Sequence, residues 1–296
     1  MKQQSRAILF ALASVLCWST VATAFKLTLG EVGVMQLVLY SSLASLLVLL
    51  LALLPRPIRR FAALRAKDIA ASALMGFLNP FAYYLVLFTA YDVLPAQQAQ
   101  PLNYTWPIVL SIMAALFLKQ RLRAKDLVAM LLSLLGVVVI STRGNFTSLE
   151  SGNGFGIALA LGSSLIWASY WILNMRSTAH PTTRLALNFF FGSLYSVVAA
   201  TVLGAWTPVG MRGLAGAVYV GVFEMGLTFL LWQAALRHAR NASSVGSLVF
   251  LSPFLSLLVI ALVLEESILP ATVIGLALIV GGIALQQWWG KGKEVS

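Results

Sequence analysis

Two apolar segments joined by a basic loop, "WPIVLSIMAALFLKQRLRAKDLVAMLLSLLGVVVI" (residues 106–140), show how this chain is organised. Each segment belongs to a run of about twenty apolar residues, the length that crosses a bilayer as a helix. The loop between them carries Lys119, Arg121, Arg123 and Lys125. Short basic loops between spans are typical of the cytoplasmic side of a membrane. The stretch therefore predicts two membrane-spanning helices joined in the cytoplasm.

The same alternation of apolar runs and short polar connections continues through the whole chain. Of its 296 residues, 60% are hydrophobic and 10% charged, and the mean hydropathy is +0.90. A soluble domain of this size could not bury so much apolar surface, so we expect an all-α integral membrane protein. The ten expected transmembrane helices lie near residues 7–28, 32–54, 68–89, 94–118, 124–142, 153–175, 184–204, 212–235, 243–264 and 270–290.

Positive charge is distributed unevenly between the two sides that these helices define. With the N-terminus in the cytoplasm, 17 of the 20 Lys and Arg residues fall on the cytoplasmic side, and Lys26, Arg143 and Arg212 fall on the other. Because cytoplasmic loops carry such an excess, we expect both termini in the cytoplasm and the chain in a bacterial inner membrane. The net charge of +11 then reflects topology, and we expect no nucleic-acid partner.

Other functional signals are few. The single cysteine, Cys17, excludes an intrachain disulfide, and no cluster of His, Cys and carboxylate residues has metal-ligand spacing. No nucleophile–base pair stands out either, so we expect no metal, no cofactor and no enzymatic activity. The expected partners are the lipid bilayer and a small-molecule solute, with the chain a monomer or a weak homodimer.

The first half of the chain aligns with the second half, helix by helix. The paired positions include Trp18 with Trp167, Gly76 with Gly221, Asn79 with Glu224 and Pro107 with Pro253, at offsets of 145 to 149 residues. Each half has five expected helices, so the second half must insert upside down. We therefore expect two five-helix repeats of inverted topology, residues 1–143 and 144–296. Such repeats are a hallmark of secondary transporters, which bind solute near the midplane between them.

These halves resemble the drug/metabolite transporter superfamily, with one EamA-type unit in each. The resemblance rests on "CWSTVATAFKL" (17–27), on residues 106–140, and on their counterpart "PFLSLLVIALVLEESILPATVIGLALIVGGIAL" (253–285). Within the superfamily, "LNYTWPIVLS" (102–111) and "WASYWILN" (167–174) most resemble the YddG-type aromatic amino-acid exporters. The resemblance implies an efflux carrier that is either gradient-linked or facilitative.

Polar and aromatic residues interrupt the fourth expected helix at mid-depth. Asn103, Tyr104 and Trp106 lie near its centre, and Pro107 removes a backbone hydrogen bond there. A freed carbonyl is tolerated at that depth where protein or a water-filled cavity satisfies it. We interpret the first three residues as substrate-binding. Pro107 and its counterpart Pro253 are predicted helix kinks, and a kink packed against its neighbours is the alternative.

Glu224 is the one carboxylate expected deep within a span. A charged side chain there costs roughly 2.5–3.5 kcal/mol on insertion scales and usually faces a cavity or a partner. Glu224 is therefore a candidate for both substrate binding and proton coupling, and a protonated Glu224 bonded to its helix neighbours is the alternative. The remaining predicted substrate-binding residues, whose amide or aromatic groups could contact a planar solute, are Trp18, Asn79, Tyr83, Trp167 and Trp171.

Together these features favour a carrier that works by alternating access around a central cavity. The expected solutes are small organic metabolites, with aromatic amino acids the best match. An exporter of cationic or lipophilic drugs or of other metabolites, with Glu224 as the charge partner, is the alternative. A channel would need a repeated filter or a ring of like charges, and the sequence has neither.

Overall fold

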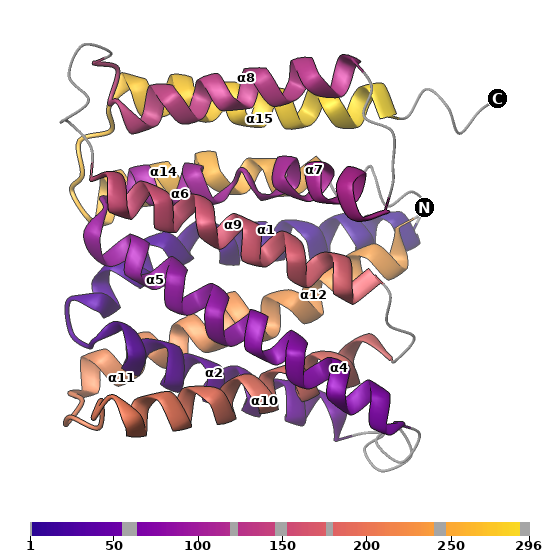
Figure 1. Ribbon diagram of the computed structural model, residues 1–296, viewed down its shortest axis with the longest axis vertical. Coiled ribbons are helices and arrows are strands. Elements are labelled where there is room, and N and C mark those ends of the chain that lie inside the picture. Colours follow the sequence, from indigo (N-terminus) through magenta and orange to yellow (C-terminus); the bar gives the residue numbers. More distant parts are fainter. Residues whose placement is uncertain are drawn as a thin grey trace.

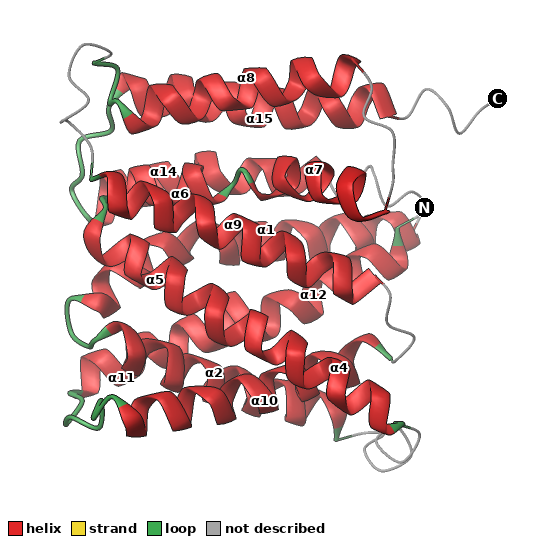
Figure 2. Ribbon diagram, in the orientation of Figure 1, coloured by secondary structure: helices red, strands yellow, loops and turns green. Residues whose placement is uncertain are grey.

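The computed structural model describes residues 2–54, 64–118, 124–145, 153–175, 180–239 and 247–290. Within these ranges the regular structure is entirely helical (Figures 1 and 2). The first half contains α1 (Lys2–Leu29), α2 (Val34–Leu53), α4 (Ala66–Gly76), the π-helical turn η1 (Phe77–Ala82), α5 (Tyr83–Val93), α6 (Ala96–Asn103), α7 (Trp106–Leu118) and α8 (Ala124–Ser141). The second half contains α9 (Gly154–Met175), α10 (Pro181–Val202), α11 (Met211–Val220), the π-helical turn η3 (Gly221–Gly226), α12 (Leu227–His238), the 3₁₀ turn η4 (Ser247–Phe250), α14 (Leu251–Val263) and α15 (Pro270–Gly290).

The expectation of a multi-pass membrane protein is confirmed. Six described segments are long and apolar enough to cross a bilayer, namely Gln3–Leu29, Val34–Leu53, Ala66–Val93, Gly154–Asn174, Pro181–Val202 and Met211–His238, and shorter apolar helices lie at Leu127–Ser141, Leu248–Val263 and Pro270–Leu285. Large apolar side chains on the outer surface, including Leu116, Val202 and Leu262, are 70–78% exposed. Such a surface is suited to lipid rather than to water.

The fourth expected helix, residues 94–118, is not continuous. α6 ends at Asn103 and α7 begins at Trp106, with a turn at Tyr104 and Thr105 between them. Pro107 therefore lies in the first turn of α7 and not in a helix interior. A proline in the first turn of a helix costs no intrahelical hydrogen bond. Pro253 likewise lies in the first turn of α14, directly after η4. The full count of ten transmembrane helices stays a prediction.

Contacts between elements of one half have counterparts in the other. α2 packs against α10, and α8 packs against α15. α1 packs against α12 as α9 packs against α5, and α1 packs against α14 as α9 packs against α7. α1 and α9, the first helix of each half, begin at opposite ends of the bundle (Figure 1).

Two aligned glycines allow the halves to approach closely. A side chain on Gly76 would collide with the backbone oxygen of Asn188 in α10, and one on Gly221 would collide with that of Ser41 in α2. The π-helical turn η1 directly follows Gly76, and the π-helical turn η3 begins at Gly221. Within η1 the helix is interrupted at Asn79, whose backbone is extended (φ −145°, ψ 119°). Each half thus widens its third helix where it crosses a helix of the other half.

α8 and α15 pack through small residues. A Cβ on Gly136 would lie 2.8 Å from the Ile279 side chain, and one on Gly275 would lie 2.7 Å from the Gly136 carbonyl oxygen. The Ser133 hydroxyl also donates a hydrogen bond of 3.2 Å to the Ile279 carbonyl. Small residues of this kind let membrane helices bring their backbones together and gain packing contacts.

Basic residues in the described part of the chain separate towards the two ends of the bundle. α1 begins and α15 ends at the same end (Figure 1), and Arg6, Arg65 and Arg237 lie on segments that reach it. Lys26 lies in the last turn of α1 and Arg212 in the first turn of α11, both at the other end (Figure 1). Ten of the basic residues predicted to face the cytoplasm lie outside the described residues. They are Arg56, Arg59, Arg60, Lys119, Arg121, Arg123, Arg176, Arg240, Lys291 and Lys293. The side of the membrane on which each end lies stays a prediction.

Candidate functional site

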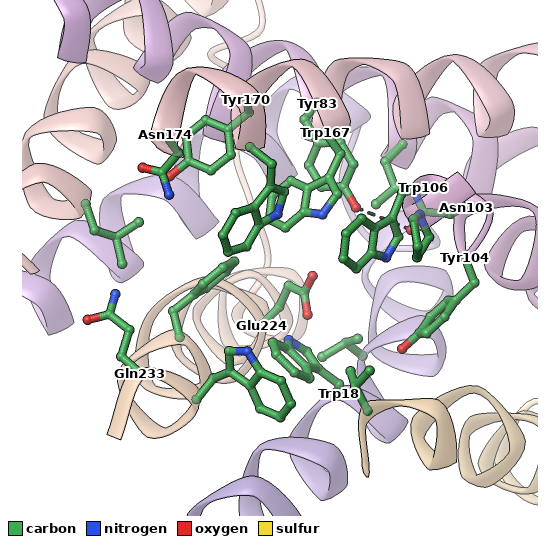
Figure 3. Close-up of a pocket in the computed structure, with 18 of the residues that line it drawn as sticks. Trp18, Tyr83, Asn103, Tyr104, Trp106, Trp167, Tyr170, Asn174, Glu224 and Gln233 are labelled. Atoms are coloured by element: carbon green, nitrogen blue, oxygen red, sulfur yellow. Dashed lines mark hydrogen bonds between the residues drawn. The ribbon is translucent and has the colours of Figure 1, made fainter. Parts of the chain in front are cut away.

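A cavity of about 350 Å³ lies inside the bundle and is lined by both halves of the chain (Figure 3). α1, α5, α6 and α7 contribute from the first half, and α9, α10, η3, α12 and η4 contribute from the second. The polar side chains in its lining, apart from the tyrosine and tryptophan groups, are Gln100, Asn103, Asn174, Arg184, Glu224 and Gln233. A mainly apolar cavity with a few polar groups is the usual form of a small-molecule site.

Aromatic rings make up much of the cavity wall. The Trp167 ring lies with its centroid 4.7 Å from that of Tyr83 and 5.6 Å from that of Tyr170, stacked on the latter. On α1, the Trp18 ring lies 5.4 Å from the Trp232 ring of α12. These flat, polarisable faces can stack on a planar solute or hold a cation over a ring.

Glu224 supplies the carboxylate in the lining, and its side chain points into the cavity from η3 (Figure 3). Its Oε1 atom accepts a hydrogen bond of 3.1 Å from the hydroxyl of Tyr84, a fully buried side chain of α5. Its Oε2 atom is buried and has no hydrogen-bond partner among the described residues. The carboxylate is therefore held in place through one oxygen, and its other oxygen has no protein donor in the described part of the chain.

The break between α6 and α7 is held by serines of α9. The Asn103 side-chain amide donates to the Ser163 hydroxyl at 2.8 Å, and the Ser164 hydroxyl donates to the Asn103 carbonyl at 2.8 Å. The Thr105 hydroxyl contacts Ser164 at 3.2 Å, and the Tyr83 hydroxyl donates to the Asn103 side-chain oxygen at 3.3 Å. Non-helical backbone at membrane depth needs such partners. The sequence suggested that a cavity or protein neighbours would satisfy this segment, and α9 supplies those neighbours.

Several polar atoms in the lining are buried without a hydrogen-bond partner in the described part of the chain. Besides Glu224 Oε2, they include Gln100 Oε1, the Trp171 indole N–H and Asn174 Oδ1. An unsatisfied buried polar group costs about 1–3 kcal/mol, so natural structures rarely retain several together without a functional reason. Water or a polar solute could supply hydrogen bonds to these groups of the lining.

One end of the cavity reaches the ends of α9, α10 and α12. Its lining there consists of Asn174, Pro181, Arg184, Gln233 and Leu236, which we call the mouth. Pro181 and Leu236 are exposed. The Phe10 ring, near the start of α1, lies 5.7 Å from the ring of His238, the last residue of α12. The mouth therefore lies at the end of the bundle where α1 begins.

A hydrogen-bonded layer joins the two halves at the opposite end. The Glu266 carboxylate accepts from the backbone N–H of Ala96 at 3.0 Å and from that of Gln97 at 3.2 Å. The Gln97 side chain donates to the Ser267 carbonyl at 3.0 Å and accepts from the Leu269 N–H at 3.0 Å. We call these contacts between the start of α6 and the α14–α15 connection the seal.

Lys26 of α1 reinforces the seal. Its ammonium donates to the carbonyls of Tyr91 at 2.7 Å and Leu94 at 3.0 Å, at the end of α5. A cation at a helix C-terminus satisfies carbonyls that lack intrahelical partners. The Phe25 ring of the same helix packs edge-on against Phe88 at 4.9 Å and against Tyr91 at 5.1 Å, and Phe25 and Tyr91 line the cavity on this side.

Most of the residues predicted from the sequence meet in this cavity. Those in its lining are Trp18, Tyr83, Asn103, Tyr104, Trp106, Pro107, Trp167, Trp171 and Glu224. Asn79 is not among them: it is 0% exposed, and its side chain lies within η1 outside the lining. The extended backbone at Asn79 breaks the helical periodicity that would have placed it on the face of Tyr83. Pro253 is buried in α14, also outside the lining.

The sequence did not single out several lining residues. Tyr170, Phe229 and Trp232 look like ordinary apolar helix residues when each is taken alone. Gln233 carried no signal apart from being nine residues after Glu224, on the same expected helix. Arg184 was counted among the cytoplasmic loop charges, whereas it lies in the first turn of α10 and lines the mouth.

Two helical halves around a shared cavity define a membrane transporter. The chain belongs to the EamA-like transporter family, which matches residues 5–142 and again residues 154–286. The resemblance to the drug/metabolite transporter superfamily, with an EamA unit in each half, is thereby confirmed.

Related proteins include amino-acid exporters. The chain is 27% identical over 223 residues to the aromatic amino acid exporter YddG of Ancylobacter novellus, covering 71% of this chain and 73% of that protein. It is 26% identical over 295 residues to a probable terminal-alkyne amino-acid exporter of Streptantibioticus cattleyicolor, covering 99% and 97%. A crystal structure with 23% sequence identity superposes with a TM-score of 0.68, covering 96% of this chain and 97% of that one, and shows the fold.

Proposed function

We propose that this protein exports aromatic amino acids across a bacterial inner membrane by alternating access. The observation that carries the proposal is that aromatic rings and a carboxylate line the same cavity. Stacked rings around Trp167 would hold an aromatic side chain, while the Glu224 oxygen without a partner would bind an ammonium group. Relatives named as amino-acid exporters support the same solute class.

The two ends of the cavity support the proposed mechanism. A carrier that works by alternating access has one end open and the other closed in each state. Here the mouth reaches the ends of α9, α10 and α12, while the seal joins the two halves at the other end. In the proposed topology, with two inverted five-helix repeats and cytoplasmic termini, the mouth faces the cytoplasm and the structure represents the state that loads solute.

Flux in proteoliposomes tests the proposed function. Purified protein should move labelled phenylalanine and tryptophan down their gradients, faster than alanine, which has no ring to stack. Unlabelled tryptophan on the same side should compete with phenylalanine. Protein that moves alanine and phenylalanine equally, or neither, contradicts the proposal.

A second candidate is the export of lipophilic cations, and Glu224 favours it because this carboxylate lies at the centre of an aromatic cavity. The same vesicles distinguish the two candidates. Movement of a lipophilic cation such as tetraphenylphosphonium, without movement of phenylalanine, would establish the cation exporter. Proton coupling through Glu224 belongs to either candidate and is tested by imposing a pH gradient.

A further inference from the structure

Among the described residues, Arg184 is the cationic side chain that lines the cavity, and it lies at the mouth. Pro181 starts α10, so Arg184 falls in the first turn of that helix, where the backbone is fixed by a hydrogen bond of 3.0 Å from its N–H to the His180 carbonyl. The side chain is partly buried and interacts electrostatically with Tyr170, another residue of the cavity wall. Arg184 is therefore a cavity residue at the start of a helix.

Polar groups in the cavity differ between its mouth and its centre. Near the mouth, Arg184 offers guanidinium N–H donors, and the buried indole N–H of Trp171 has no acceptor in the part of the chain described. Away from the mouth, Glu224 Oε2 and Gln100 Oε1 are acceptors that have no hydrogen-bond donor in the described part of the chain. Donors suit a carboxylate, and acceptors suit an ammonium group.

We propose that Arg184 is a specificity-determining residue that binds the carboxylate of the solute at the mouth, with the Trp171 N–H as a second donor. This proposal rests on the proposed export of aromatic amino acids and adds the group that recognises their acidic end. A guanidinium is suited to this because its planar set of donors matches a carboxylate and it remains charged at all relevant pH values.

The geometry separates this contact from the one at Glu224. Gln233, beside Arg184 at the mouth, lies in α12, whereas Glu224 lies nine residues earlier in sequence, in the preceding turn η3. A solute that enters through the mouth therefore meets Arg184 before Glu224. Arg184 then contributes to the affinity for the carboxylate of the solute, and Glu224 contributes to the affinity for its ammonium group.

Three ligands with the same phenyl ring test the assignment. Phenylalanine carries both charges, phenethylamine carries only the ammonium group, and 3-phenylpropionate carries only the carboxylate. Binding of each would be measured by isothermal titration calorimetry with wild-type protein and with Arg184→Gln, Arg184→Lys, Glu224→Gln and Arg237→Gln. Arg237 is the matched control, because it is an exposed arginine of α12 at the same end of the bundle and outside the cavity lining.

We expect Arg184→Gln to weaken binding of phenylalanine and 3-phenylpropionate by about tenfold or more, the loss typical of a charge-assisted hydrogen bond. Binding of phenethylamine should change by less than about twofold. Glu224→Gln should show the opposite pattern, with 3-phenylpropionate least affected. Arg184→Lys should retain part of the affinity, and Arg237→Gln all of it.

The outcomes separate this proposal from the proposed function. If the wild type binds phenylalanine but Arg184→Gln weakens all three ligands equally, or none, Arg184 does not select the carboxylate and the exporter proposal stands. If the wild type binds only 3-phenylpropionate, and loses it in Arg184→Gln, the anion site stands and the amino-acid function fails. If the wild type binds none of the three ligands, both proposals fail. Circular dichroism and gel filtration of each variant show whether the fold is retained.

Discussion

The carboxylate of Glu266 accepts a hydrogen bond from the backbone N–H of Gln97 across 169 residues of sequence, and from the N–H of Ala96 beside it. These two N–H groups lie in the first turn of α6, where no intrahelical acceptor exists and the helix dipole favours an anion. Glu266 therefore caps a helix of the first half from the second half. In a carrier that opens at this end, the two halves must part here.

Glu266→Ala should open the sealed end of the cavity. The variant loses the acceptor for both N–H groups, and losing such a cap costs about 1 kcal/mol. In a Cys17→Ser background with a cysteine at Leu87, in the lining near the seal, a membrane-impermeant maleimide should label Glu266→Ala faster than the parent protein.

The matched control for the seal is Glu265→Gln. Glu265 is the neighbouring residue, exposed, and makes none of the contacts of the seal. Equal labelling of Glu266→Ala and the parent protein would show that the Glu266 cap does not keep this end closed.

Glu224→Gln should reduce phenylalanine export by roughly tenfold or more, because a charge-assisted hydrogen bond contributes about 1.5–3 kcal/mol. The glutamine oxygen can still accept from Tyr84, so folding should be preserved. Initial rates in proteoliposomes, with and without an imposed pH gradient, measure the effect. Tyr84→Phe is the companion variant, since it releases the carboxylate without removing its charge. An unchanged rate and unchanged response to the gradient in Glu224→Gln would exclude Glu224 from both binding and coupling.

Trp106→Ala should weaken the binding of aromatic solutes by roughly tenfold while leaving membrane insertion normal, because it removes one aromatic contact from the cavity wall. Ligand-induced shifts in thermal stability over a phenylalanine concentration series give the affinity. Trp206→Ala is the control, since Trp206 is 52% exposed and lies outside the lining. A variant that loses expression instead of affinity would show that Trp106 serves packing.

Ser164→Ala should lower the stability of the protein by about 1 kcal/mol, because the Asn103 carbonyl at the break between α6 and α7 loses its hydroxyl donor. Thermal unfolding in detergent would show a lower midpoint. Ser169→Ala, five residues further along α9, removes a hydroxyl that bonds the Leu165 carbonyl of its own helix and lies 3.8 Å from the sulfur of Met113 in α7. Because a thioether is a weak acceptor, this variant should lower the midpoint less than Ser164→Ala. Equal midpoints for both variants would mean that the break does not depend on α9.

Gly275→Val should destabilise the pairing of α8 and α15, because its side chain would collide with the Gly136 carbonyl and with Ile140. Overpacking of this kind costs about 1–3 kcal/mol. Gly162→Ala is the control, since a Cβ at Gly162 meets no atom within 4 Å. Yield of folded protein and its unfolding temperature should fall for Gly275→Val alone.

The sequence by itself determined the class of protein and much of the composition of the site. Hydrophobicity is a local property, so runs of about twenty apolar residues identify membrane helices without knowledge of the fold. Polar residues that are costly in lipid, such as Glu224 and Asn103, can also be recognised from the sequence as candidate site residues, because they must face something other than hydrocarbon. Both line the cavity.

Tertiary structure decided which of these residues meet and where the cavity opens. Asn79 and Tyr83 are four residues apart, yet the extended backbone at Asn79 leaves only Tyr83 in the lining. Arg184 was counted with the cytoplasmic charges, and it lines the mouth because α10 begins where α9 and α12 end. The contact of Glu266 with Gln97 joins segments that no local pattern connects. Such relationships depend on how distant helices pack, which hydropathy and spacing along a single chain do not encode.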